Sequence, residues 1–104
     1  MTSPRTPATL CALILLGAGV ATGQTAQAQS AQAMVQNCFV CHGPGAKGSL
    51  AIVALAGRPK ELIAQQLLAY KADQRPGTIM LRIAKGYSDE QIGAIAAFVA
   101  TLPK

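Results

Sequence analysis

Two cysteines and a histidine stand close together in this sequence, at Cys38, Cys41 and His42. Their spacing is C-x-x-C-H. On a helical turn, two thiols three positions apart lie on one side, where they can form thioethers with the two vinyl groups along one side of a porphyrin. The imidazole of the next residue then lies under the iron as its proximal ligand. The pattern therefore predicts covalent attachment of haem c at Cys38 and Cys41, with His42 as an axial ligand.

Three other chemistries use the same residue types. A redox-active C-x-x-C of the thioredoxin type would follow a strand in a βαβ unit, and the flanking sequence shows none. A zinc site needs four ligands, whereas the only histidine and these two cysteines supply three at most. A plain Cys38–Cys41 disulfide would close a very short loop and constrain the unfolded chain little. Haem attachment is the favoured interpretation.

The sixth iron ligand follows from the positions of the methionines. Met1 is the initiator, and Met34 lies four residues before Cys38, on the same expected helix. Met80 follows His42 by 38 residues, enough chain to return on the opposite haem face. We therefore expect Met80 to be the second axial ligand, in a loop containing Pro76 and Gly77. A lysine ligand and an open site are the alternatives.

The N-terminal segment has the pattern of a secretory signal peptide. Arg5 precedes an apolar run of about ten residues, which is shorter than the ~20 residues of a spanning helix. Two Ala-x-Ala sites follow, ending at Ala28 and Ala33. We expect cleavage after Ala28, so that residues 1–28 are the signal peptide and residues 29–104 the mature domain. The chain would then reach an oxidising compartment, the bacterial periplasm, with no permanent membrane anchor.

Composition narrows the remaining possibilities. The 104 residues include four Phe or Tyr, no Trp, 9 basic and 4 acidic side chains. These numbers exclude a large aromatic core and a long disordered charged chain. No basic stripe is interleaved with aromatic residues, so a nucleic-acid partner is not expected. A mature domain of 76 residues is small for an apolar core alone, and a covalent cofactor would help to hold it together.

The elements that must position these residues are helices, and we predict an all-α domain of three to four helices. The first covers about 31–41, the second runs from near Pro59 to about Lys71, and a short one covers about 81–85. The last begins at Ser88 with a capping box and carries an apolar stripe ending at Leu102. Residues 43–58 form a loop, with a strand at 50–55 as the competing possibility. Four apolar residues of that loop, Leu50, Ile52, Val53 and Leu55, are expected to pack on the proximal haem face.

The haem motif, Leu55–Gly57, Tyr70-Lys71 and above all the segment Arg75–Glu90 resemble a class I cytochrome c. The last segment is similar to the cytochrome subunit of flavocytochrome c sulfide dehydrogenase. The resemblance implies an electron-transfer protein rather than an enzyme, with haem on Cys38 and Cys41 and iron held by His42 and Met80. It also implies a flavoprotein partner that oxidises sulfide and passes electrons to this haem, and a downstream soluble acceptor.

One departure from that family concerns the histidine. Class I cytochromes usually have Gly-Pro after the haem motif, and the proline carbonyl accepts the histidine N–H. Ser49-Leu50 align there, so we expect the Leu50 carbonyl to take this bond.

The sequence is also compatible with other functions. The chain could be a freely diffusing electron carrier for a terminal oxidase or another periplasmic enzyme, or a haem sensor or catalyst with an open sixth site. Arg75, Arg82 and Lys85 bracket Met80, and they are candidates for steering an acidic partner to the haem edge.

Overall fold

The computed structural model describes residues 29–104; the predicted signal peptide, 1–28, lies outside the described residues. The described part is all-α, as predicted, and its one β-type pairing is an isolated bridge between Ser49 and Ile52 rather than a strand at 50–55. Its elements are α1 (Ala31–His42), the 3₁₀ turn η1 (Pro44–Ala46), α2 (Lys60–Lys71), α3 (Ile79–Lys85) and α4 (Asp89–Thr101). Within residues 29–104 no helix is both long enough and apolar enough to cross a membrane.

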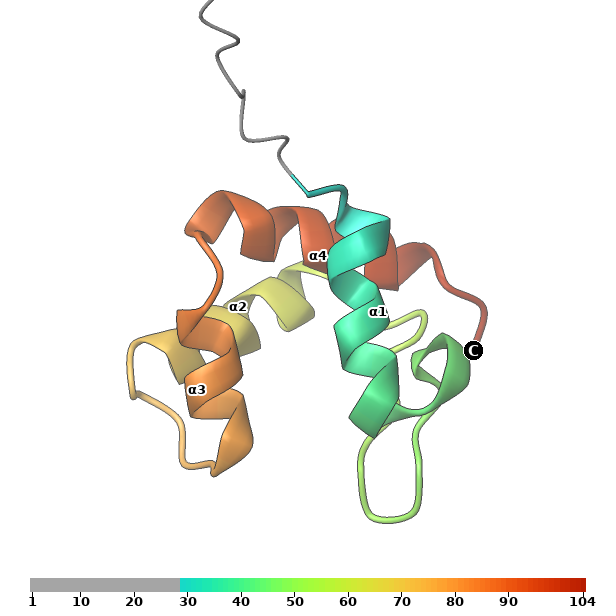
Figure 1. The fold of residues 1–104 in the computed structure, drawn as a ribbon, viewed down its shortest axis with the longest axis horizontal. Helices are drawn as coiled ribbons and strands as arrows, with labels where there is room; N and C mark the ends of the chain where they lie inside the picture. The colour runs from blue at the N-terminus through green and yellow to red at the C-terminus, as the bar shows by residue number, and fades with distance from the viewer. Residues whose placement is uncertain (1–28) are drawn as a thin grey trace, which may run out of the picture.

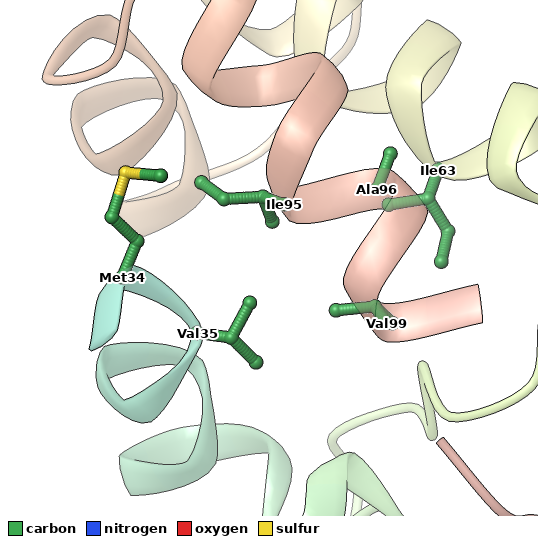
Figure 2. Packing of buried hydrophobic residues seen from close by; sticks show 6 residues of the cluster. All are labelled: Met34, Val35, Ile63, Ile95, Ala96 and Val99. Atoms are coloured by element: carbon green, nitrogen blue, oxygen red, sulfur yellow. The ribbon is translucent and has the colours of Figure 1, made fainter. Parts of the chain in front are cut away.

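Helix α4 organises the domain, because α1 and α2 both pack against it while α3 packs on α2 (Figure 1). The central cluster joins Met34 and Val35 of α1 to Ile95, Ala96 and Val99 of α4, and Ile63 of α2 closes it (Figure 2). Burying an Ile, Val or Met side chain fully contributes about 1.5–3 kcal/mol relative to leaving it exposed. Ile95, Ala96 and Val99 belong to the predicted apolar stripe of α4, so most of this stripe lies in the core of the domain.

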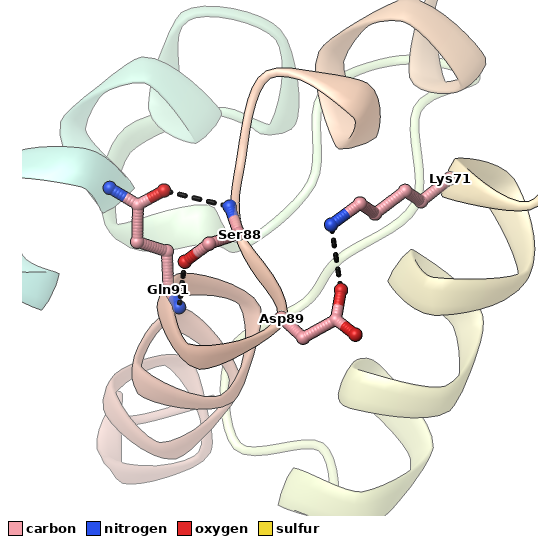
Figure 3. A network of polar contacts seen from close by, with 4 residues as sticks. All are labelled: Lys71, Ser88, Asp89 and Gln91. Carbon is pink, nitrogen blue, oxygen red and sulfur yellow. Dashed lines mark hydrogen bonds and ion pairs between the residues drawn. The ribbon is translucent and has the colours of Figure 1, made fainter.

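The helix ends follow local sequence signals. Ser30 caps α1 by accepting a hydrogen bond from the backbone N–H of Ala33 at 3.2 Å. At α4, the Ser88 hydroxyl accepts from the Gln91 N–H, and the Gln91 side chain accepts from the Ser88 N–H, which is the predicted capping box (Figure 3). Pro59 immediately precedes α2, so its fixed φ leads the chain into that helix.

Two exposed ion pairs tie the segment between α2 and α4 at both ends. Lys71 Nζ lies 2.6 Å from a carboxylate oxygen of Asp89, joining the end of α2 to the start of α4 (Figure 3). Lys85 Nζ donates to both carboxylate oxygens of Asp73, each at 2.7 Å. Exposed pairs contribute only about 0–1 kcal/mol each, so they orient the helix ends more than they stabilise the fold.

Two predicted helix boundaries differ from the structure by one or two residues. Helix α3 begins at Ile79, not Leu81, so Met80 is part of the helix rather than of the loop before it. No proline lies between Gly77 and Gly86, and nothing therefore prevents the helix from starting earlier. Leu102, the predicted end of the apolar stripe, is the C-cap just beyond α4, because its backbone is extended rather than helical. Its side chain is half-buried.

Candidate haem site

The last turns of α1 bring the three motif side chains together. Cys38 lies three residues before Cys41 and four before His42, so the three are neighbours on the helix surface. Both cysteines are free thiols, with Cys38 half-buried and Cys41 exposed, so the alternative disulfide is not formed. Burial raises the pKa of the Cys38 thiol above its ordinary value. The helix thus presents one inner and one outer sulfur beside the histidine.

The imidazole of His42 is buried, with 9% of its surface exposed, and it has a fixed orientation. Its Nδ1 is 2.7 Å from the backbone carbonyl oxygen of Val53. A carbonyl can only accept, so Nδ1 carries the proton and donates. In the neutral ring the lone pair is then on Nε2, which is the form of imidazole that binds a metal.

The acceptor was predicted at the wrong residue. We expected the Leu50 carbonyl, but Leu50 lies at the tip of a small hairpin, with its side chain fully exposed and a φ of +48°. Ser49 and Ile52 bond to each other across that tip, which turns the chain back. The carbonyl that reaches His42 therefore comes three residues later, at Val53.

Three backbone contacts at the base of the 43–58 loop place the Val53 carbonyl. The N–H of Gly48 donates to the carbonyl of His42 at 2.7 Å, so the outgoing chain returns at once to the end of α1. The carbonyl of Ala46 accepts from Leu55 at 2.8 Å and from Ala56 at 3.0 Å, which anchors the returning chain. Val53 lies between these anchors and is thereby held beside the histidine.

Glycine is required at the first of these contacts. Gly43 has a φ of +81°, and a Cβ there would overlap the carbonyl oxygen of Gly48. A side chain at Gly43 would therefore separate Gly48 from the end of α1, and the loop would lose its path to Val53.

The four apolar residues predicted to pack beneath the haem separate into two groups. Leu55 is half-buried and packs against the central cluster. Leu50, Ile52 and Val53 are exposed on the hairpin, and Val53 contributes its backbone carbonyl to the site.

The two methionines considered as ligands occupy different environments. Met34 is 2% exposed and lies in the central cluster close to Ile95 (Figure 2), so its side chain is part of the core. Met80 is half-buried in the first turn of α3. Figure 1 shows α3 on the opposite side of the domain from the lower end of α1, which carries His42. The two helices are linked through α4 and α2.

The donor set on α1 fits a haem better than a bare metal ion. Within residues 29–104, no group of three or more His, Cys, Asp or Glu side chains is arranged to hold an ion, which argues against the zinc interpretation. Two thiols beside a buried imidazole with its Nε2 lone pair available are the groups that attach haem c and bind its iron from one side. The Val53 carbonyl is the member of the site that the sequence did not predict; Gly43 and Gly48 suggest turns in this loop, but only the structure shows that these turns bring Val53 to the histidine.

Comparison with known proteins agrees with this chemistry. The Cytochrome c family model matches residues 26–103, and the chain therefore belongs to the cytochrome c family, of the class I type. It is an electron-transfer protein rather than an enzyme, and its cofactor is covalently bound haem c.

Two relatives illustrate the range of the similarity. The chain is 37% identical over 68 residues to the cytochrome subunit of sulfide dehydrogenase from Chlorobaculum tepidum, an alignment that covers 65% of this chain and 62% of that protein. It is 31% identical over 94 residues to cytochrome c-553 from Helicobacter pylori, covering 86% of this chain and 96% of that protein.

A third relative is much longer than the matched region. The chain is 34% identical over 72 residues to a thiosulfate dehydrogenase electron acceptor from Stutzerimonas stutzeri, covering 65% of this chain but 33% of that protein. The chain thus spans less than two thirds of both this relative and the Chlorobaculum subunit.

Proposed function

We propose that this protein holds one haem c through thioethers to Cys38 and Cys41, with His42 and Met80 as the two axial ligands of the iron. The observation that carries the proposal is the 2.7 Å hydrogen bond from His42 Nδ1 to the Val53 carbonyl. This bond leaves the Nε2 lone pair of the neutral ring available to bind iron. The position of Met80 on a separate helix, with Met34 committed to the core, supports the choice of the second ligand. When bound, the haem exchanges single electrons.

Each residue of the site has a separate task in that exchange. The two cysteines fix the cofactor to α1, and the Val53 carbonyl holds the His42 ring in one orientation and one tautomer. A methionine thioether raises the reduction potential relative to a second histidine, and filling both axial positions favours electron transfer over chemistry at the iron. The described residues thus supply what a one-electron carrier needs.

The attachment proposal has a direct test. The protein purified from cells able to mature c-type cytochromes should gain the mass of one haem, show a Soret band and leave no thiol at Cys38 or Cys41 for alkylation. The matched variant Cys38→Ala, Cys41→Ala removes both proposed thioethers and should lose the covalent mass. A colourless product with two alkylatable thiols would contradict the proposal.

The partner we favour is the flavoprotein subunit of a sulfide dehydrogenase, with a soluble acceptor downstream. Similarity to the Chlorobaculum subunit supports this choice, as does the resemblance of Arg75–Glu90. Sulfide plus the flavoprotein should reduce the haem rapidly, and the two proteins should elute together on gel filtration. A protein that stays monomeric and is reduced no faster with the flavoprotein than without it would sink the proposal.

The second candidate is a free electron carrier for a terminal oxidase or another redox enzyme. Its support is the match to cytochrome c-553, which extends over nearly the whole of that protein. Reduction of an oxidase by the protein at micromolar concentration, with no stable complex to any flavoprotein, would favour it.

Three cationic side chains on the segment around Met80 differ in the contacts that they make. Lys85 is paired with Asp73, the Arg75 guanidinium lies over the Tyr70 ring, and Arg82 lines a shallow hollow with Thr78 and Ile79. We propose Arg82 as the cation most available to an acidic partner. Arg82→Gln should lower the bimolecular electron-transfer rate at low salt and reduce its dependence on ionic strength. Lys104→Gln, at the chain terminus, is the control for the loss of one positive charge.

Export through a signal peptide of residues 1–28 completes the proposal and places the protein in the periplasm. The start of α1 supports cleavage after Ala28 rather than Ala33. Ser30 is the helix cap, and its carbonyl accepts from Met34 at 3.1 Å. Cleavage after Ala33 would remove both contacts and the first turn of α1. Mass spectrometry of the exported protein should therefore show a chain that begins at Gln29.

A further inference from the structure

The aromatic ring of Tyr70, in the last turn of α2, is enclosed by two residues of the loop that leads to Met80. The guanidinium carbon of Arg75 lies over the ring, 5.1 Å from its centroid. Gly77 lies against an edge of the same ring, so closely that a Cβ there would be 2.7 Å from Tyr70 Cε1 and 3.4 Å from Cδ1. The two loop residues on either side of Pro76 thus both contact Tyr70.

The other contacts of this loop lie near its start, where Asp73 pairs with Lys85 of α3. Among the described residues, backbone hydrogen bonds outside the helices reach it at Asp73 and Gln74, which bond to the carbonyls of Tyr70 and Ala69. Residues 75–79 are exposed, and Thr78 precedes α3 without a side-chain cap. The Tyr70 ring is therefore the main contact that fixes where the chain lies just before Met80.

The glycine at position 77 is required for space rather than for backbone conformation. Its φ does not fall in the left-handed region, in contrast to Gly43, Gly45, Gly48 and Gly57. An alanine could adopt the same backbone angles, so the damage from Gly77→Ala would come from its overlap with the Tyr70 ring. The effect of Gly77→Ala should therefore depend on whether the Tyr70 ring is present.

We propose that Tyr70 is a positioning residue for Met80. Its ring sets the path of residues 75–78, and through them the approach of the Met80 thioether to the haem iron. The inference rests on the proposed axial role of Met80. It assigns the positioning to the ring itself, which Arg75 covers and Gly77 abuts, and not to the phenol hydroxyl.

The test is competition for the sixth iron position in the oxidised holoprotein. Imidazole is added, and its dissociation constant is read from the visible spectrum. We expect Tyr70→Ala and Gly77→Ala each to bind imidazole at least tenfold more tightly than the unmodified protein, because Met80 is held less well. Tyr70→Phe keeps the ring and should bind like the unmodified protein. In a Tyr70→Ala background, adding Gly77→Ala should change the affinity less than twofold, because the overlap is gone.

Two controls distinguish the positioning role of Tyr70 from the proposed axial role of Met80. Ile63→Val, in the core part of α2, lowers stability without touching the loop, and its imidazole affinity should stay within twofold of the unmodified protein. Met80→Ala should bind imidazole most tightly of all. If Met80→Ala binds no more tightly than the unmodified protein, the axial role of Met80 fails and this inference with it.

If Met80→Ala binds tightly but Tyr70→Ala and Gly77→Ala do not, the axial role stands and the positioning role is overturned. An effect of Tyr70→Phe as large as that of Tyr70→Ala would assign the role to the hydroxyl and equally overturn the inference.

Discussion

The Nδ1 of His42 and the carbonyl oxygen of Val53 are 2.7 Å apart, although 11 positions separate the two residues in the chain. The bond joins the end of a helix to a loop whose regular structure is limited to the 3₁₀ turn η1 and one isolated bridge. The contribution of Val53 is its backbone, so its side chain is free to vary. The orientation of the histidine consequently depends on the loop's path, and the residues that set this path matter more than the acceptor's identity.

Gly43→Ala tests that dependence. The substitution places a Cβ at a φ of +81° and against the Gly48 carbonyl, so the loop must shift away from α1. Left-handed strain together with backbone overlap should lower the free energy of unfolding by about 2–3 kcal/mol. Guanidinium chloride unfolding of the holoprotein measures it, and a shift in the reduction potential should accompany it because the His42 hydrogen bond changes.

The matched control is Gly93→Ala in α4. Apart from the adjacent backbone of α4 itself, no atom lies within 4 Å of the new Cβ, and the φ of Gly93 lies outside the left-handed region. Removing a glycine from a helix interior should raise the free energy of unfolding by about 0.5–1 kcal/mol and leave the potential unchanged. Equal losses in the two variants would show that the loop geometry at Gly43 is not special.

The sequence predicted the helices well because their signals are local. The capping box at Ser88 and Gln91, the proline before α2 and the apolar stripe of α4 each act within one or two helical turns. The family model and the similarity to known cytochromes c confirm the haem cofactor that the C-x-x-C-H spacing predicted.

The 43–58 loop was predicted less well because its path is set by contacts between distant backbone groups. Counting residues from the family pattern pointed to Leu50, but the hairpin closed by Ser49 and Ile52 moves the acceptor to Val53. The side chains of Leu50 and Val53 give no indication of which backbone carbonyl will reach the histidine. The start of α3 was misplaced for a related reason, since Pro76 and Gly77 indicated a loop without showing where it ends.

Met80→Ala should open the sixth position of the iron. The reduced variant should bind carbon monoxide with a large spectral shift at neutral pH, and its reduction potential should fall because the thioether is lost. The unmodified protein should show no such shift. Met34→Leu is the control: it nearly conserves volume in the central cluster, so it should lower stability by less than about 1.5 kcal/mol and leave the spectrum unaltered. A carbon monoxide shift in the unmodified protein would remove Met80 from the iron.

Leu50→Asn should stabilise the protein. Leu50 holds a φ of +48° with its side chain fully exposed, so the replacement loses no burial within the described residues. Asparagine adopts the left-handed conformation more readily than leucine, and the gain should be up to about 1 kcal/mol. Thermal unfolding of the holoprotein checks this prediction.

The comparison is Leu55→Asn. Leu55 packs against the central cluster, so this substitution should lower the free energy of unfolding by at least about 2 kcal/mol. A loss of stability in Leu50→Asn would mean that the leucine side chain makes a contact worth more than the strain.

Ser88→Ala should weaken the start of α4, which both α1 and α2 need as a packing surface. The hydroxyl accepts from the Gln91 N–H at 3.1 Å, and its removal should lower the free energy of unfolding by about 1 kcal/mol. Ser88→Gly removes the same hydroxyl but should lose only a few tenths of a kcal/mol, because glycine is itself tolerated as an N-cap. Neither change touches the proposed iron ligands, so the visible spectrum should be the same in both. A loss in Ser88→Gly as large as that in Ser88→Ala would show that the hydroxyl makes the whole contribution and that backbone preference at the cap makes none.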